Sequence, residues 1–298
     1  MNISSALSNN NLEASELPLN GDGSIYHLAL FPEDIAETIL VAGDPARAKK
    51  IASYFDKIEL EKSNREFHTY TGTLNGKRLT TMSTGIGTDN IDIALQELDA
   101  LANIDLEKRE IRKEHKSLSL IRLGTCGALQ EDIPVDTLVA SKYGLGFDGL
   151  LNYYKTDYSK NEISIRDAFI AHTSYPMQWA KPYVVEGDQD LRLNLAYDLV
   201  TGITATASGF YGPQGRELRL PKYHEDMNDL IASFEWQKEK ILNYEMETSA
   251  LYGLCASLGH KATTICAVIA NRSRKEKSKD YKKTVQLMIE MVLERSTQ

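Results

Sequence analysis

The fold is indicated most directly by residues 38–55, which read TILVAGDPARAKKIASYF. Thr38 to Val41 are β-branched or aliphatic without interruption, which is typical of a strand buried on both faces. From Ala46 to Phe55 the apolar residues recur at helical spacing instead. Asp44 can cap this helix, and Pro45 suits its first turn. A buried strand that leads directly into an amphipathic helix is typical of an α/β protein.

The rest of the chain repeats this alternation of strands and helices. Asn75-Gly76 separates the segments 66–74 and 77–84, and this dipeptide favours a type I′ hairpin. Further strands are predicted at 118–123, 137–141, 203–208 and 263–270, and further helices at 89–101, 191–199, 224–237, 247–258 and 278–294. Because no repeat or linker interrupts the pattern, we predict an α/β fold: a single domain with a central mixed β-sheet flanked by helices.

Two segments have a different composition. Residues 1–24 are rich in Ser, Asn and Gly and carry few large apolar residues, so we predict a flexible or loosely docked N-terminal tail before a domain at 25–298. Residues 107–116, which read EKREIRKEHK, are nearly all charged and are expected to form a solvated helix end or loop. A docking site for a partner is the less favoured alternative for this run.

Composition and charge exclude several classes of protein. The 298 residues are 42% hydrophobic and 26% charged, which excludes a fibrous or wholly disordered chain. With 34 Lys and Arg against 42 Asp and Glu, the net charge of -8 disfavours nucleic-acid and anionic-membrane partners. No apolar run reaches the length of a membrane helix. A targeting peptide would require basic residues near the N-terminus, and no Lys or Arg precedes Arg47. Three cysteines are best interpreted as reduced thiols, so we expect a cytoplasmic protein.

Common cofactor and metal motifs are absent from the sequence. No stretch matches the phosphate loop G-x4-G-K-[S/T], and HExxH, GxSxG and CxxC are also missing. We therefore expect no cofactor and no bound metal.

The turn after the first strand is the first candidate binding element. Gly43 leaves its backbone N–H unobstructed, and the N-terminus of the following helix favours an anion. Arg47, one turn along the helix, adds a guanidinium fork. The alternative is a well-formed strand-to-helix turn with no ligand.

A second candidate is the segment IRLGTCG at residues 121–127. Arg122 in an apolar strand end is costly unless its guanidinium meets an anion or a carboxylate. Thr125 adds a hydroxyl group, and Gly124 and Gly127 permit close approach of a ligand. A structural salt bridge of Arg122 is the alternative.

A third candidate is the segment NYEMETSA at residues 243–250, where a strand meets a helix. Glu247 is a bidentate acceptor that suits vicinal sugar hydroxyls, with Glu245 beside it, and Met246 can supply an apolar wall. Alternatively, Glu247 only stabilises the dipole of the helix.

The fourth candidate is the Gly- and Pro-containing segment GFYGPQGR at residues 209–216. Phe210 offers a stacking face, while Gln214 and Arg216 match a flat, carbonyl-bearing heterocycle such as uracil. The amide would read O2 and N3–H, and the guanidinium would take O4. A plain loop is the alternative. Together, the four segments describe an anion pocket, a diol acceptor and a heterocycle reader, which is a nucleoside plus phosphate.

Seven motifs resemble those of the purine-nucleoside/uridine phosphorylase family, and within it the uridine phosphorylases. They are GDPARAKKIA, NREF, STGIG, IRLGTCGAL, FYGPQGR, NYEMET and VIANR, and they occur in the order and spacing of the family. The resemblance extends from Tyr26 to the C-terminus. It implies the nucleoside phosphorylase fold and the reversible phosphorolysis of uridine to uracil and ribose 1-phosphate, with inorganic phosphate as co-substrate.

The resemblance also implies roles for individual residues. The phosphate would be bound by Gly43, Arg47, Arg65, Arg122 and Thr125, and the ribose by His27, Glu245, Met246 and Glu247. The base would be bound by Phe210, Gln214, Arg216, Ile269, Ala270 and Arg272. Catalysis would depend on Arg122, Gln214 and Arg216, which act by charge and hydrogen bonding.

Two of these residues imply an oligomer. Arg65 and His27 would be donated by a neighbouring subunit, so the resemblance implies at least a homodimer and suggests a hexamer. In many bacterial members a Ser near Asn90 helps Glu66 to bind a monovalent cation between subunits, and Asn90 argues against that ion here.

The choice of base is inferred from a departure within the family. Purine-specific relatives carry an Asp where this chain has Ala270-Asn271-Arg272, and the missing acid argues for a pyrimidine. Two alternatives remain: a phosphorylase or hydrolase acting on purine or other nucleosides, and a non-catalytic nucleoside-binding protein.

Overall fold

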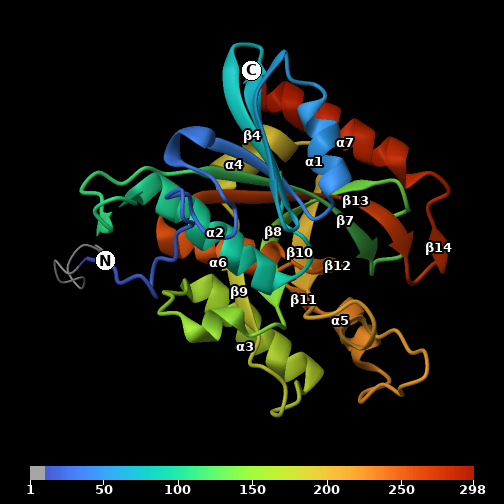
Figure 1. Cartoon of the computed structure of the whole chain (residues 1–298). Helices are drawn as coiled ribbons and strands as arrows, with labels where there is room; N and C mark the ends of the chain where they lie inside the picture. The colour runs from blue at the N-terminus through green and yellow to red at the C-terminus, as the bar shows by residue number, and fades with distance from the viewer. Residues whose placement is uncertain (1–10) are drawn as a thin grey trace.

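Strand β1 (Thr38–Ala42) forms where the sequence predicts it and lies inside a large mixed sheet. It pairs in parallel with β4 (Lys77–Ser83) and with β7 (Ser119–Ala128). The computed structural model describes residues 11–298 and is shown in Figure 1. The sheet and its helices confirm the predicted α/β fold class.

The strands of the large sheet follow the order β11-β12-β10-β8-β13-β7-β1-β4-β3-β2. Strand β9 (Tyr183–Glu186) pairs with β8, and β14 (Glu276–Lys277) pairs with β13. The remaining strands of this sheet are β2 (Lys57–Asn64), β3 (Phe67–Leu74), β8 (Leu138–Gly146), β10 (Val200–Thr206), β11 (Glu235–Trp236), β12 (Glu239–Glu245) and β13 (Lys261–Asn271). Near its end, β7 also pairs with β12 in the antiparallel sense.

Helices cover both faces of the sheet, because alternate strand residues point to opposite sides. Ile39 and Val41 of β1 pack into one core with α2 (Thr88–Asn103) and α6 (Thr248–Leu258). Leu40 packs into a second core with α1 (Pro45–Ala52), α4 (Gln189–Ala196) and α7 (Tyr281–Thr297). In Figure 1 the labels α1 and α7 accordingly lie on the other side of the sheet from α2 and α6.

A third core lies where α3 (Lys160–Thr173) and α5 (Met227–Ser233) pack against β8, β10 and β12. Helix α3 is absent from the sequence prediction because few of its residues are apolar and buried, among them Ile165 and Phe169, so its periodicity is weak. The helix predicted at 224–237 is too long: α5 ends at Ser233, and β11 follows it.

The predicted hairpin is confirmed at Asn75 and Gly76. Their φ angles are 52° and 76°, as a type I′ turn requires, and β3 pairs with β4 on either side.

The N-terminal segment and the charged run pack against each other. Arg109 donates from Nη1 to the Leu17 carbonyl at 2.6 Å, and the Leu12 amide donates to the Arg109 carbonyl at 2.8 Å. Residues 11–24 therefore pack against the domain, and residues 1–10 of the predicted tail lie outside the described residues. The charged run forms part of a small hairpin, β5 (Ile104–Asp105) and β6 (Glu110–Ile111), instead of a helix end.

Between residues 11 and 298, no helix combines the length and the apolar character needed to cross a membrane.

Candidate active site

Arg122 lies in β7, near the middle of the large sheet. It pairs with Val41 of β1 on one side and with Thr264 of β13 on the other. The strand continues to Ala128, beyond the end predicted from the sequence. A Cβ atom at Gly124 would overlap the Arg122 guanidinium, so the glycine gives this side chain the space it occupies.

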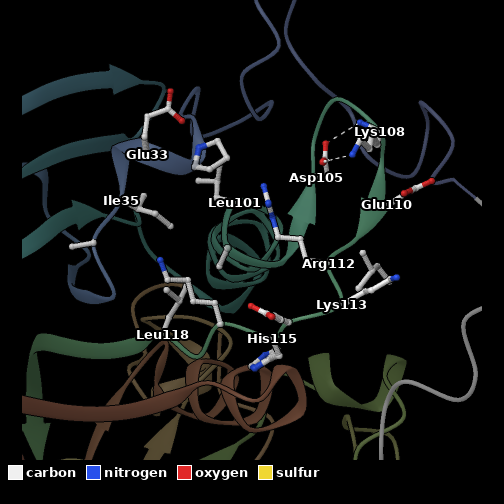
Figure 2. Close-up of a pocket in the computed structure, with 16 residues that line it drawn as sticks. Glu33, Ile35, Leu101, Asp105, Lys108, Glu110, Arg112, Lys113, His115 and Leu118 are labelled. Carbon is white, nitrogen blue, oxygen red and sulfur yellow. Dashed lines mark hydrogen bonds and ion pairs between the residues drawn. The ribbon is translucent and has the colours of Figure 1, made fainter.

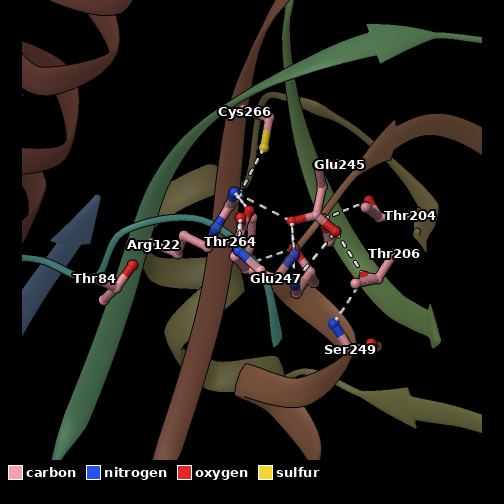
Figure 3. A network of polar contacts seen from close by, with 12 residues as sticks. Thr84, Arg122, Thr204, Thr206, Glu245, Glu247, Ser249, Thr264 and Cys266 are labelled. Atoms are coloured by element: carbon pink, nitrogen blue, oxygen red, sulfur yellow. Dashed lines mark hydrogen bonds and ion pairs between the residues drawn. The ribbon is translucent and has the colours of Figure 1, made fainter. Parts of the chain in front are cut away.

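The Arg122 guanidinium is buried between two carboxylates, as Figure 3 shows. Its Nη2 contacts Glu247 directly and lies 3.2 Å from Glu245, while Nη1 donates to the Cys266 sulfur at 3.3 Å. Burial alone would lower the pKa of Arg122, but the two carboxylates raise it. The salt bridge considered for Arg122 is therefore present.

Glu245 is enclosed by donors. Its carboxylate accepts hydrogen bonds from the backbone amides of Glu247 and Thr248, both at 2.9 Å, and from the Thr206 hydroxyl at 2.6 Å. Arg122 is a further partner of this carboxylate, and only 4% of the residue is exposed. Glu245 therefore faces the start of α6. Glu245 thus orients Arg122 through the ion pair and Glu247 through its backbone amide.

Glu247 joins the Arg122 cluster to a loop that sequence reasoning did not assign to the site. Its Oε1 accepts a hydrogen bond from the Gly87 amide at 2.8 Å. Gly87 belongs to the STGIG motif, which was the available signal. Burial raises the pKa of Glu247, and the charge of Glu245 adds to this effect. Met246, between the two acids, is half-buried.

Arg47 reaches the same end of the sheet from α1. Its Nη1 donates to the Leu123 carbonyl at 3.0 Å. Burial lowers the pKa of Arg47, and so does the nearby charge of Arg122. No carboxylate among residues 11–298 lies within ion-pair distance of Arg47, so its charge remains available to an anion.

Gly43 lies in the turn between β1 and α1, and Thr125 lies in β7 beyond Arg122. A Cβ atom at Gly43 would lie 3.0 Å from the Gly85 carbonyl oxygen, so the close approach of the two turns requires a small residue. Thr125 is half-buried in β7 and pairs with Ala267.

Gln214, Arg216 and Arg272 form a second cluster. Gln214 is 4% exposed, and its Oε1 accepts from Arg216 Nη1 at 2.7 Å and from Arg272 Nη2 at 3.2 Å. The Arg216 guanidinium lies 3.7 Å from the centre of the Phe210 ring. Burial and the neighbouring Arg216 lower the pKa of Arg272 to about 10.

This arrangement changes the expected reading of the base by Gln214. A carbonyl oxygen has two lone pairs, and both guanidiniums already use the Oε1 atom. The amide therefore presents its Nε2 hydrogens, and the cluster offers donors only. The N3–H reading expected from the sequence would need one of these hydrogen bonds to break.

Residues of β7, β12 and β13 connect the two clusters. Gly127 pairs with Tyr244, and Arg272 lies 5.2 Å above the Tyr244 ring. Ile269 lies where the register of β13 shifts, and Ala270 follows it beside β14.

Asn271, in the segment Ala270-Asn271-Arg272, has a structural role. Its side-chain amide donates to the carbonyls of Gln130 at 2.8 Å and Ile133 at 2.6 Å. These contacts hold the turn after β7.

His27 and Arg65 lie together, in contact with Asn64 and Tyr26. Asn64 donates to the His27 carbonyl at 2.8 Å, and Arg65 lies 5.8 Å above the Tyr26 ring. His27 Nδ1 is 2.7 Å from Glu97. Within residues 11–298, neither His27 nor Arg65 forms a hydrogen bond or ion pair with Arg47, Arg122, Gln214 or Glu247.

Glu66 and Asn90, the residues considered for a monovalent cation, both border Gly85. The Asn90 amide nitrogen is the nearer group to Gly85. An amide nitrogen is a hydrogen-bond donor and offers no lone pair to a cation.

Another cavity lies away from these residues, under the β5–β6 hairpin (Figure 2). Its volume is about 920 Å³, and its lining includes Arg112 and His115 but none of the predicted site residues. A cavity of about 870 Å³ lies at the second cluster, and it is lined in part by Tyr211, Gly215 and Arg216.

One group of potential metal ligands, Asp99, His115 and His260, occurs near that hairpin. The Leu118 amide donates to His260 Nδ1 at 3.1 Å, so the ring hydrogen belongs on Nε2, which lies 3.1 Å from Asp99. A protonated Nε2 has no lone pair free for a metal, and the contact is interpreted as a structural link between α2 and the residue that precedes β13.

Several known proteins are similar to this chain in sequence and in fold. A family model described as the phosphorylase superfamily matches residues 37–297. The uridine phosphorylase of Thermococcus kodakarensis is 29% identical over 278 residues, which cover 92% of this chain and 87% of the relative. That of Escherichia coli strain K12 is also 29% identical, over 91% of this chain and 96% of the relative. A solved Trypanosoma brucei nucleoside phosphorylase, described as showing uridine phosphorylase activity, has a TM-score of 0.86 and 30% identity, and covers 94% of this chain and 98% of its own.

The buried charges predict a large stability difference between two arginine variants. Arg122→Ala leaves Glu245 and Glu247 uncompensated and should lower the free energy of unfolding by about 3–5 kcal/mol. Arg47→Ala removes only a hydrogen bond to a carbonyl and should cost about 1 kcal/mol. Urea unfolding of both variants measures the difference.

The loss in Arg122→Ala should also depend on pH. Without the guanidinium, the folded-state pKa of Glu247, which burial already raises, rises further above its unfolded value, so the penalty grows with pH and is smaller at about pH 5 than at about pH 8. An equal loss in both arginine variants at every pH would contradict the assigned ion pairs.

Proposed function

The chain belongs to the phosphorylase superfamily, and from this premise we propose that it catalyses the reversible phosphorolysis of uridine to uracil and ribose 1-phosphate. The family match confirms the resemblance seen in the motifs. The observation that carries the proposal is the cluster of Arg47, Arg122 and Glu247 beside a donor-only group around Gln214. An oxyanion, a sugar diol and a base with carbonyl groups are the chemistry that suits these two clusters.

Phosphate is proposed to bind at Arg47, Arg122, Gly43 and Thr125. A unit-charge pair at about 4 Å contributes about 4 kcal/mol at an effective dielectric of about 20. This local attraction outweighs the net charge of -8, which is diffuse and screened beyond about 8–10 Å. An overall acidic chain can therefore hold a phosphate dianion.

The charge balance supports a contribution from a second subunit. Arg47 and Arg122 are offset by Glu245 and Glu247, so these four side chains sum to zero formal charge. Arg65 of a neighbouring subunit would make the site positive before phosphate binds. Within residues 11–298 of their own chain, neither Arg65 nor His27 forms a hydrogen bond or ion pair with these four side chains.

The ribose is proposed to bind at Glu247 and Met246, with His27 of the neighbouring subunit at the 5′-hydroxyl. Glu247 has one oxygen on Gly87 and one on Arg122, and both carry further lone pairs for the sugar hydroxyls. Glu245 would act through the orientation of Arg122 and Glu247.

The base is proposed to bind against Phe210, Ile269 and Ala270, with Gln214, Arg216 and Arg272 as hydrogen-bond donors. Phosphate attacks C1′, the C1′–N1 bond breaks, and its electron pair goes to N1 of uracil. Donors directed at the uracil carbonyls stabilise this negative charge, so catalysis is positioning and electrostatic stabilisation. No covalent enzyme intermediate is required.

Three further features belong to this proposal. Phosphate acts as co-substrate, and no cofactor or metal is assigned a step. The enzyme is proposed to be a homo-oligomer, at least a dimer and by family resemblance a hexamer. A cytoplasmic location agrees with its acidic charge and its three free, buried cysteines.

A substrate panel tests the proposed reaction. Uridine, thymidine, inosine and adenosine are each incubated with the protein, with and without phosphate, and release of the free base is measured. We expect uracil release that requires phosphate. Release from purine nucleosides instead, or binding of uridine with no phosphate-dependent cleavage, would favour one of the two alternatives.

Two substitutions should separate the phosphate and base subsites. Arg47→Ala should raise the KM for phosphate at least about tenfold and change the KM for uridine little, because it removes one charged contact. Gln214→Ala should do the reverse. Steady-state kinetics with each substrate varied in turn measures both constants, and equal effects on both in either variant would remove that residue from its subsite.

Mixed oligomers should reveal shared sites. At substrate concentrations well below the wild-type KM values, Arg65→Ala and Gln214→Ala should each retain about a tenth of the wild-type activity or less, because each raises a KM at every site. Co-expression of the two should restore about a quarter of the wild-type activity if sites form between paired subunits, since mixed pairs contain one intact site. Different affinity tags on the two chains verify that mixed oligomers form, and their formation without recovered activity would contradict sharing.

A further inference from the structure

We infer that the cavity of about 870 Å³ is a second ligand site, which takes a planar aromatic molecule that carries an anionic group, such as a nucleoside monophosphate. The cavity lies between the end of β8, the segment that follows α3, and the segment from Tyr211 to α5. Of the residues predicted to bind phosphate, ribose or base, only Arg216 lines it. The inference therefore goes beyond the proposed function and does not depend on it.

The turn that carries Gln214 forms one wall of the cavity without opening Gln214 to it. Asn228 and Gly215 line the cavity, and Asn228 Nδ2 donates to the Gln214 carbonyl at 3.3 Å. Gly215 has a φ of 69°, and a Cβ atom at this position would overlap the Asn228 side chain, so the turn packs directly against α5. Gln214 itself is 4% exposed and does not line the cavity. A ligand in the cavity would therefore contact the turn and not the Gln214 amide.

Aromatic rings form another wall of the cavity. The centre of the Trp179 ring lies 5.4 Å from that of Tyr175 and 5.6 Å from that of His224, and Tyr223 lies 4.9 Å from His224. Trp179 is half-buried and Tyr223 is 71% exposed, so ring surface remains available to a ligand. Stacking on aromatic side chains binds flat heterocycles and tolerates different bases, because every base has a π-face.

Two polar side chains at the cavity have no partner in the part of the chain that the structure describes. The Tyr175 hydroxyl forms no hydrogen bond within residues 11–298, and burial raises the pKa of Tyr175, so the group remains a donor at neutral pH. The Arg219 side chain is exposed and forms no hydrogen bond or ion pair within the same residues. A guanidinium without a partner suits a phosphate or a carboxylate.

The charge around the cavity also favours an anion. Its charged lining consists of three basic and two acidic side chains: Arg216, Arg219, Lys222, Asp148 and Glu225. Their formal charge of +1 contrasts with the charge of -8 on the whole chain. The Asp148 carboxylate already accepts hydrogen bonds from the Tyr183 hydroxyl at 2.9 Å and the Ser249 hydroxyl at 3.2 Å. The acid inside the cavity is therefore largely satisfied by protein donors.

The size and the rim of the cavity suit this class of ligand. Small-molecule sites have volumes of about 300–1,000 Å³, and the cavity lies within that range. Leu218 and Leu220 also line it and are 75% and 84% exposed, so a ligand would cover apolar surface that now faces water. A nucleoside monophosphate would place its base against the rings of Trp179 and Tyr223 and its phosphate at Arg219.

Tryptophan fluorescence tests the site directly, because the chain has two tryptophans and Trp179 is the one that lines the cavity. In a Trp236→Phe background, the protein is titrated with adenosine 5′-monophosphate, whose base is not the one proposed for the catalytic site. We expect a saturable change in fluorescence with a Kd below about 1 mM. Saturating uridine, added without phosphate, should leave this Kd unchanged.

Variants and a second ligand separate the two parts of the site. Arg219→Ala should raise the Kd at least about fivefold, and adenosine should bind at least about fivefold more weakly than its monophosphate. Arg274→Ala is the matched control, since Arg274 is exposed but does not line the cavity, and it should match the wild type. In calorimetric titrations, Trp179→Ala should raise the Kd at least about fivefold, whereas Trp236→Ala should not.

Three results would overturn the inference. They are the absence of any fluorescence change or heat at millimolar adenosine 5′-monophosphate, competition by uridine, and equal Kd values for Arg219→Ala and Arg274→Ala. Competition by uridine would place the nucleotide in the proposed substrate site instead. None of these measurements requires turnover, so a protein that cleaves no uridine would refute the proposed function and leave this test intact.

Discussion

The buried guanidinium of Arg122 is the constraint on which the centre of this protein depends. An unpaired charge in the middle of a sheet would cost several kcal/mol, so the fold must bring carboxylates to it. Glu245 and Glu247 do so from the junction of β12 and α6. Glu245 in turn accepts the first amides of α6, and Glu247 accepts the Gly87 amide. The charge of Arg122 in β7 thereby connects the junction of β12 and α6 with the loop at Gly87.

The position of the cluster of Gln214, Arg216 and Arg272 follows from the path of β12. Tyr244 and Glu245 are consecutive residues of this strand, so their side chains point to opposite faces. Glu245 lies against Arg122, whereas Tyr244 lies under Arg272. The antiparallel pairing of Gly127 with Tyr244 then joins β7, which carries Arg122, to the strand that lies under Arg272. Sheet geometry thus sets the spacing of two chemically different subsites.

Several parts of this arrangement could be predicted from local sequence. The β1–α1 turn and the Asn75-Gly76 hairpin have strong local signals, and both occur as expected. Helix α3 was missed because it buries few apolar side chains, and the helix predicted at 224–237 was too long because α5 ends at Ser233 and Glu235–Trp236 form β11. The candidate residues could be named because an Arg in an apolar strand or two acids around a Met are unusual in a core. Their roles as phosphate, ribose and base ligands came from the resemblance and are still predictions.

By itself, the sequence determined the α/β class, the segments that carry polar groups into an apolar setting and the family to which they correspond. These are local properties, since each depends on residues within a few positions of one another. Only the tertiary structure decided that Arg122 is compensated by Glu245 and Glu247, that Gln214 presents donors and that Asn228 supports it. Those contacts join residues more than a hundred positions apart in one case and come from side-chain orientation in the others, which no local pattern specifies.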